Sequence, residues 1–336
     1  MRALSGTARA TFLEAAQEPS VLLLALAGAA LATLVPVFQF HQMGEPGRLA
    51  RDSGLACLLM FGLPLAIAGA SATVHRELSD GTAAVALAKP LPRGLFLVGK
   101  FLGVTGVCAV FWWAVTAAML LAERASERTV DTGTQILDVS DGRLSTLALL
   151  APIAALAVAA LLNYLRRARF GVAAFIGIPS ALTLVLLASG FWSPQSADVE
   201  EGVNTLLLHW HWAWDAQLAW RCVPVALLLL FALWMYAAFA TAMAARFGGG
   251  GTMGLSFALF SLGLCADAVT RGGTAWWREI FGALVPNAQH FWMADFLARG
   301  GTLPAGYLLI GCAWTLGWCV VFLMLGTFLL NRRDVG

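Results

Sequence analysis

Two histidines, His209 and His211, have the residue type and spacing that come nearest to a metal site in this chain. Neutral imidazole nitrogens are common ligands of zinc and copper. Residues two positions apart on a helix point away from each other, and no third strong ligand is close in the sequence. We therefore interpret both as interfacial histidines, retain them as metal candidates, and expect no metal site.

A second candidate for chemistry is a stretch that imitates a phosphate-binding loop. Residues 94–100 read Gly-Leu-Phe-Leu-Val-Gly-Lys, which fits the first seven positions of the pattern G-x-x-x-x-G-K-[ST]. Phe101 stands where a serine or threonine would hold magnesium, the intervening residues are all apolar, and no strand precedes them. We therefore exclude nucleotide binding here and expect this chain to contain no cofactor.

Catalytic groups are missing from the long apolar stretches. An intramembrane enzyme needs a nucleophile with a base, or a metal, at membrane depth, and no histidine lies in the middle of any apolar stretch. Transporters driven by an ion gradient usually carry ionisable residues within their spans, whereas here Asp267 is the nearest case. The sequence predicts no catalytic residue, and it leaves a secondary transporter or a structural membrane anchor open as alternatives.

The elements that position these residues are membrane spans. Hydrophobic residues make up 60% of the chain and charged residues 12%, whereas charged residues are about a quarter of a soluble protein. A span needs about 20 residues with few or no charges. We predict an all-α integral membrane protein, a single polytopic domain over residues 1–336 with about eight transmembrane helices. The spans lie near residues 21–40, 54–74, 101–122, 144–165, 170–192, 222–245, 250–268 and 304–329.

The charges between the spans predict the orientation. With the N-terminus inside, twelve of the 21 basic residues but only five of the 19 acidic residues fall on the inner side, as expected from the excess of Lys and Arg in cytoplasmic loops. We expect a protein of the plasma membrane, the inner membrane in a bacterium, with both termini in the cytoplasm. The basic residues are spread over short turns, so we expect no nucleic acid as a partner.

Two segments outside the spans have amphipathic or aromatic patterns. Residues 1–19 place apolar side chains at helical spacing and are expected to form an amphipathic helix along the inner surface. Residues 272–299 carry Trp276, Trp277 and Trp292 among charges, which is typical of an interfacial position. We expect short interfacial or re-entrant helices there, on the outer side, and an outer gate and an ordinary aromatic belt fit the pattern equally well.

The segment 76–100, between the second and third spans, has the most distinctive pattern. Ser79 or Asp80 can cap a helix over residues 81–88, and Pro90 with Pro92 ends it. Lys100 then opens the next span, and we expect its amine to extend to the inner interface. The sequence predicts a short cytoplasmic helix that lies across the end of the second span, where a soluble partner can reach it.

This segment resembles the permease subunits of type 2 ABC transporters (ABC-2), including the permeases associated with multicopper enzyme maturation. The shared pattern is an acidic residue, Gly-Thr, a leucine, a proline, an arginine and a lysine, found here at Glu77, Gly81, Thr82, Leu87, Pro90, Arg93 and Lys100. A second similar stretch contains Pro286, Asn287, His290, Phe291 and Asp295. Family members commonly have six spans, so the spans at 144–165 and 170–192 are expected to be an additional pair.

The resemblance implies a function and partners. Segment 76–100, with Asp80 included, would be a coupling helix that docks into a separate ATPase subunit, which would bind ATP and Mg²⁺. Residues 286–295 would form an outer gate region. Two permease chains, identical or different, would pair within the membrane lipid. The chain would thus be a transport subunit, most simply of an exporter, and not itself an enzyme.

Overall fold

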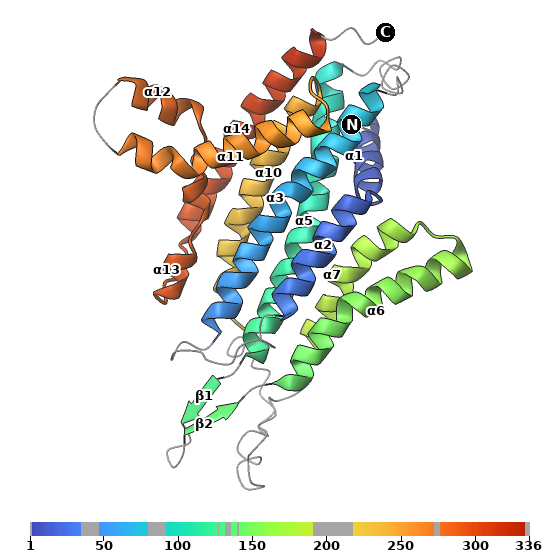
Figure 1. Ribbon diagram of the computed structural model, residues 1–336, viewed down its shortest axis with the longest axis vertical. Helices are drawn as coiled ribbons and strands as arrows, with labels where there is room; N and C mark the ends of the chain where they lie inside the picture. The colour runs from blue at the N-terminus through green and yellow to red at the C-terminus, as the bar shows by residue number, and fades with distance from the viewer. Residues whose placement is uncertain are drawn as a thin grey trace.

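The computed structural model describes residues 2–34, 47–79, 92–126, 128–131, 136–139, 141–190, 218–271 and 276–332. Most of these residues are helical, and the longest helices lie side by side in an elongated bundle (Figure 1). The prediction of a helical membrane protein is confirmed. One short antiparallel hairpin, β1 (Arg128–Asp131) with β2 (Ile136–Val139), interrupts the helices. Residues 123–143 are polar and acidic, and this composition did not predict the hairpin.

Seven helices in the described part of the chain are long and apolar enough to cross a bilayer. They coincide with seven of the eight expected spans, because uninterrupted apolar runs of this length fold as helices that satisfy their own backbone groups in lipid. The seven are α3 (Arg48–Ser79), α5 (Arg93–Ala125), α6 (Gly142–Arg166), α7 (Phe170–Ser189), α10 (Cys222–Ala244), α11 (Gly249–Thr270) and α14 (Ala305–Asn331).

Two of these helices, α3 and α5, exceed the spans predicted for them by far the most. The sequence predicts spans over 54–74 and 101–122, whereas α3 and α5 continue past both ends of these ranges. Ion pairs join the extensions, because Arg51 of α3 pairs with Glu123 of α5 at one end and Glu77 pairs with Lys100 at the other. Paired charges can be accommodated inside a helix bundle, so the helices do not stop where the charges begin.

The first expected span differs most from its prediction. Two helices, α1 (Arg2–Ala15) and α2 (Pro19–Leu34), meet at a bend of 70°. α2 has 16 residues, and the remainder of the expected span, 35–40, lies outside the described residues. Together the bent pair is long and apolar enough to count as one span. The eighth span therefore stays a prediction.

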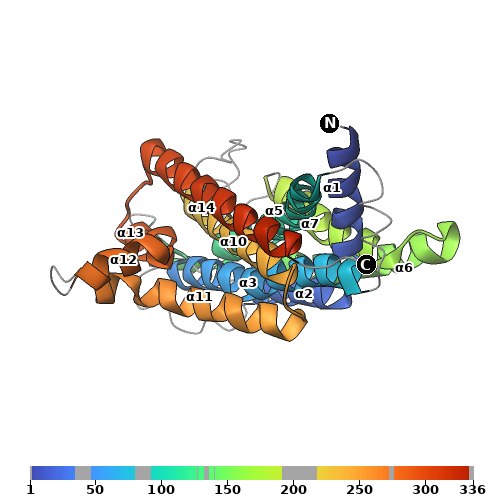
Figure 2. The same cartoon turned by 90° about the horizontal axis from the view of Figure 1, so that it is seen from above.

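Two parts of the chain lean away from the centre of the bundle. α6 and α7 form a hairpin, and the end of α6 extends away from the other helices in both views (Figures 1 and 2). On another side, α11 is followed by α12 (Trp276–Leu284), η2 (Ala288–Phe291) and α13 (Ala294–Ala298). These short helices occupy the region 272–299, whose depth and side in the membrane stay predictions.

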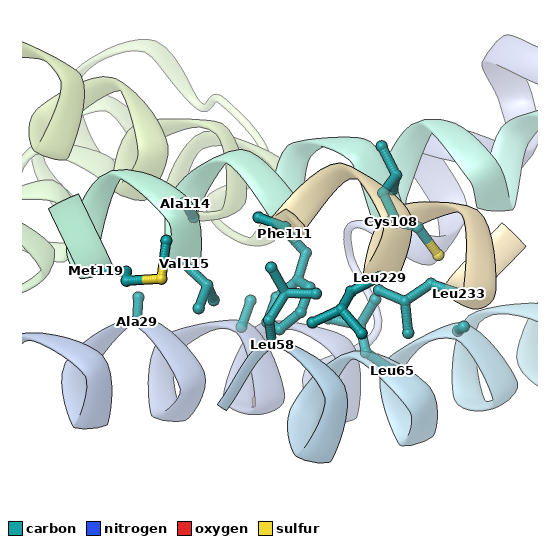
Figure 3. Packing of buried hydrophobic residues seen from close by; sticks show 14 of the residues in the cluster. Ala29, Leu58, Leu65, Cys108, Phe111, Ala114, Val115, Met119, Leu229 and Leu233 are labelled. Atoms are coloured by element: carbon teal, nitrogen blue, oxygen red, sulfur yellow. The ribbon is translucent and has the colours of Figure 1, made fainter. Parts of the chain in front are cut away.

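The centre of the bundle is formed by α5 and α10, which pack against α3 (Figure 3). Phe111 of α5 and Leu233 of α10 are fully buried and approach the backbone of α3 at Gly62. A Cβ added to Gly62 would lie 2.9 Å from Phe111 and 2.7 Å from Leu233. A glycine here lets three helices approach closely, as is common where helices pack in lipid.

Candidate functional site

The segment expected to contact a partner, 76–100, is flanked by the ends of two long helices. α3 ends at Ser79 and α5 begins at Arg93. Five of the expected site residues lie outside the described residues, namely Asp80, Gly81, Thr82, Leu87 and Pro90. The other three, Glu77, Arg93 and Lys100, are described, and each contacts another part of this chain.

Lys100 is the centre of an ion-pair cluster that joins three helices. Its Nζ lies 2.7 Å from Glu77 Oε1 of α3 and 3.4 Å from Glu14 Oε2 of α1. The Lys100 side chain is only 2% exposed, so its amine contacts two carboxylates instead of water, and its depth relative to the inner interface stays a prediction. Two carboxylates from neighbouring helices compensate the ammonium group for lost hydration, which is why it can stay inside the protein.

A second ion pair connects α3 to the bend between α1 and α2. Arg76 Nη2 lies 3.1 Å from Glu18 Oε2, and about half of the arginine side chain is exposed. An exposed pair of this kind contributes little to stability. Its importance is positional, because the consecutive residues Arg76 and Glu77 contact the bend and α5, respectively.

Arg93 joins the beginning of α5 to the last turn of α14. Its Nη1 donates a hydrogen bond of 3.2 Å to the carbonyl oxygen of Leu330. A cation at this position is favourable because the last carbonyls of a helix carry partial negative charge. Leu330 also belongs to a separate apolar cluster at this end of the bundle, together with Val74, Leu78, Phe96, Leu97, Ala244 and Ala245. This cluster packs α3, α5, α10 and α14 together.

The cluster around Lys100 has more acid than base. Glu14 and Glu77 share one ammonium group. Burial raises the pKa of Glu14, in α1 and outside the seven spanning helices, although attraction to Lys100 opposes this shift and repulsion from Glu77 adds to it. Protonation of Glu14 would leave one carboxylate for one ammonium. The cluster can therefore take up a proton and keep its central ion pair.

His75 lies next to this cluster and was not singled out from the sequence. Its Nδ1 is buried and has no hydrogen-bond partner in the part of the chain that the structure describes. Its ring faces the turn between α10 and α11, where a Cβ added to Gly248 would lie 3.7 Å from His75 Nε2. A lone histidine at the end of an apolar run gives no signal of such a position.

The region around Asn287 forms a second network, which connects α11, η2 and α14. Asn287 caps η2, since its Oδ1 accepts a 2.9 Å hydrogen bond from the backbone N–H of Gln289. Its Nδ2 donates to Asp267 of α11 and lies 3.3 Å from His290 Nε2. The hydroxyl of Tyr307 in α14 donates to the carbonyl oxygen of His290 at 2.9 Å. Asn287 and His290, both expected site residues, are thus brought together with Asp267.

The three other residues of the expected gate region, Pro286, Phe291 and Asp295, differ in their surroundings. A Cβ added to Gly263 of α11 would lie only 2.6 Å from the carbonyl oxygen of Pro286, so glycine is required for this close approach. Phe291 is buried against α10 and α11. Asp295 is exposed in the first turn of α13, and no hydrogen bond or ion pair links its carboxylate to another described residue.

A buried ion pair that the sequence did not reveal lies at the opposite ends of α3 and α5. Arg51 Nη1 lies 3.3 Å from Glu123 Oε1, with the two side chains 8% and 9% exposed. Gly47, with φ of 74°, brings its backbone against Glu123. Next to this pair, Arg124 donates a 2.8 Å hydrogen bond to Ser189 of α7. α3 and α5 are therefore joined by an ion pair at each end.

The metal candidates His209 and His211 lie outside the described residues. Within the described ranges, no group of three or more His, Cys, Asp and Glu side chains is placed to hold a metal ion.

No family model and no curated protein matches this chain. The resemblance to ABC-2 permeases therefore stays an expectation that is based on the residues named in the sequence analysis.

Proposed function

We propose that this chain is the membrane-spanning permease subunit of a type 2 ABC transporter, and that it works as an exporter driven by a separate ATPase subunit. ATP and Mg²⁺ would bind to that partner. The observation that carries the proposal is the contact between Glu77 and Lys100. These residues open and close the pattern that resembles the family, and their contact joins the two helices that flank the proposed docking segment.

The contacts around the docking segment supply a physical route into the bundle. Lys100 connects α5 to α1, Arg76 connects α3 to the α1–α2 bend, and Arg93 connects α5 to α14. Packed helices shift as rigid elements between discrete arrangements. A displacement of residues 80–91 by an ATPase would therefore act on α1, α3, α5 and α14 together.

The positions of the termini support the proposed orientation. The first and last described helices begin and end, respectively, at the end of the bundle where α3 stops and α5 starts (Figure 1). A cytoplasmic location for both termini therefore agrees with a cytoplasmic location for the docking segment. We further propose that two permease chains pair in the membrane. Among the seven spanning helices, α11 and α14 have the smallest buried fractions, and they offer surface to lipid and to the second chain.

The test is purification of the tagged chain from its native membrane, followed by mass spectrometry and an ATPase assay. We expect a stoichiometric ATP-binding subunit that is lost when residues 80–91 are replaced by a Gly/Ser segment of equal length. The matched control replaces residues 132–135, between β1 and β2, in the same way and should retain the subunit. A chain that purifies without any ATPase in all three forms would instead support a secondary transporter or a structural anchor.

A further inference from the structure

An apolar groove with a volume of about 800 Å³ lies between α6, α7 and α1. This volume is in the range of about 300–1,000 Å³ that is typical of ligand sites. Its walls include Val158 of α6, Ile176 of α7 and Leu13 of α1. The hydroxyl of Ser180 also lines it but donates to the carbonyl oxygen of Ile176 in its own helix at 2.8 Å. The walls therefore suit a hydrocarbon chain.

The groove is long enough to hold an acyl chain that reaches through one leaflet of a bilayer. Its residues on the α7 side extend from Arg169 to Leu184, which corresponds to about 22 Å at 1.5 Å per residue. The hydrocarbon core is about 30 Å thick in total. One leaflet is half of this, about 15 Å. An extended acyl chain that starts at the membrane surface and crosses one leaflet can therefore lie entirely within the groove.

Three arginines lie close together in the sequence where α6 ends and α7 begins, next to the groove residues Leu162 and Ala168. Arg166, Arg167 and Arg169 are exposed, and none of their side chains has a hydrogen-bond or ion-pair partner in the described part of the chain. Arg169 lines the groove itself. No Asp or Glu occurs between Asp141 and Asp198. This end of the hairpin therefore has positive charge with no internal compensation.

The connection that carries these arginines is a defined turn. Asn163 Nδ2 donates a 2.6 Å hydrogen bond to the carbonyl oxygen of Ala168, and Arg167 adopts the left-handed conformation with φ of 52°. The beginning of α7 packs on the α1–α2 bend, since a Cβ added to Gly171 would lie 2.9 Å from Gln17 Cα. The arginines are thus held at a fixed place relative to the groove.

We propose that this groove is a binding site for one anionic phospholipid, with an acyl chain along α6 and α7 and the phosphate at Arg166, Arg167 and Arg169. A phospholipid supplies an apolar chain and a negative charge in one molecule, and basic pockets between spanning helices bind such headgroups. A second copy of this chain fits less well. The described acids at this end, Glu14, Glu18 and Glu77, are already paired with Lys100 or Arg76.

The test is native mass spectrometry of the full chain in detergent, titrated with phosphatidylglycerol or with phosphatidylcholine. We expect one phosphatidylglycerol to bind in preference to phosphatidylcholine. The Arg166→Gln, Arg169→Gln double variant should bind it roughly thirtyfold more weakly, because each arginine near a lipid headgroup changes affinity about fivefold. The matched control, Arg143→Gln with Arg246→Gln, removes the same charge from exposed positions elsewhere and should bind as the wild type does.

A second variant tests the groove without changing charge. Ser180→Trp fills the groove from an exposed position and should also lower phosphatidylglycerol binding, with the melting temperature of the lipid-free protein preserved. Equal binding of both lipids, or wild-type binding by the double arginine variant, would overturn the proposal. So would groove variants that convert a dimer to a monomer with lipid binding unchanged, because a second copy would then be the occupant. None of these outcomes depends on an ATPase partner.

Discussion

Lys100 Nζ and Glu77 Oε1 lie 2.7 Å apart and connect the two helix ends between which residues 80–91 run. The lysine is 2% exposed and the glutamate 29% exposed. The ammonium group is therefore shielded from solvent, whereas the carboxylate is partly open to it. Glu14 approaches the same ammonium group from α1. One buried cation therefore holds α1, α3 and α5 together at the place where a partner is proposed to act.

Removal of the Lys100 charge should destabilise the protein, because two carboxylates would lose their common partner. We expect Lys100→Met to lower the free energy of unfolding by about 1–3 kcal/mol, less than for a fully buried pair because both glutamates are partly solvated. Glu77→Gln in the same chain should restore part of the loss. Thermal unfolding in detergent of Lys100→Met, of Glu77→Gln and of the double variant, each compared with the wild type, completes a double-mutant cycle.

The control for this cycle is Arg76→Met, which breaks a half-exposed pair with Glu18. It should cost only about 0.2–1 kcal/mol. Strictly additive effects of Lys100→Met and Glu77→Gln would show that the two side chains do not interact in solution.

Glu14 should make stability depend on pH. Because its pKa is raised above the usual value of 4.5 by burial, the folded protein binds this proton more tightly than the unfolded chain does. This contribution to stability is present at low pH and is lost as the pH rises from about 4.5 through the higher folded pKa. Glu14→Gln cannot titrate, so its melting temperature minus that of the wild type should increase from pH 4.5 toward neutrality.

The comparison for Glu14 is Glu279→Gln, which removes one carboxylate from an exposed position in α12. A melting-temperature difference for Glu14→Gln that stays constant or decreases with rising pH would show that burial does not favour the protonated carboxyl.

Gly263 should tolerate no side chain, because its backbone passes the carbonyl oxygen of Pro286. A Cβ would lie 2.6 Å from that oxygen, and backbone cannot move aside as a flexible side chain can. We expect Gly263→Ala to cost about 1–3 kcal/mol, the range for overpacking. Gly254→Ala, in the same helix with nothing within 4 Å of its added Cβ, is the matched control. Equal melting temperatures for the two variants would contradict the packing of Pro286 on α11.

Most of the fold could be predicted because lipid restricts what an apolar run can become. A charge-poor stretch of about 20 residues has to satisfy its backbone groups internally and therefore forms a helix. The bend between α1 and α2 and the hairpin β1–β2 were not predictable in this way. Both lie outside long apolar runs, where contacts with neighbouring elements decide the conformation.

Less of the candidate site could be predicted, because charge partners depend on which helices are neighbours. The sequence places Lys100 at the beginning of a span, and an isolated lysine there is expected to reach toward water. Glu14 and Glu77 reverse this outcome, but they come from two other helices, 86 and 23 positions earlier in the numbering of the chain. The pair Arg51–Glu123 was missed for the same reason. Asn287 and His290 were singled out by their pattern, whereas their contact with Asp267 required the fold.

The central claim is that residues 80–91 contact an ATP-binding subunit, and photo-crosslinking in the native membrane tests it most directly. A photoreactive amino acid is placed at Leu87 and, as the control, at Thr134 between β1 and β2. The account predicts a crosslinked product with an ATP-binding protein from position 87 and none from position 134, with the yield from position 87 changed by ATP. The absence of such a product at position 87, in a chain that is inserted and folded as the wild type is, would contradict the account.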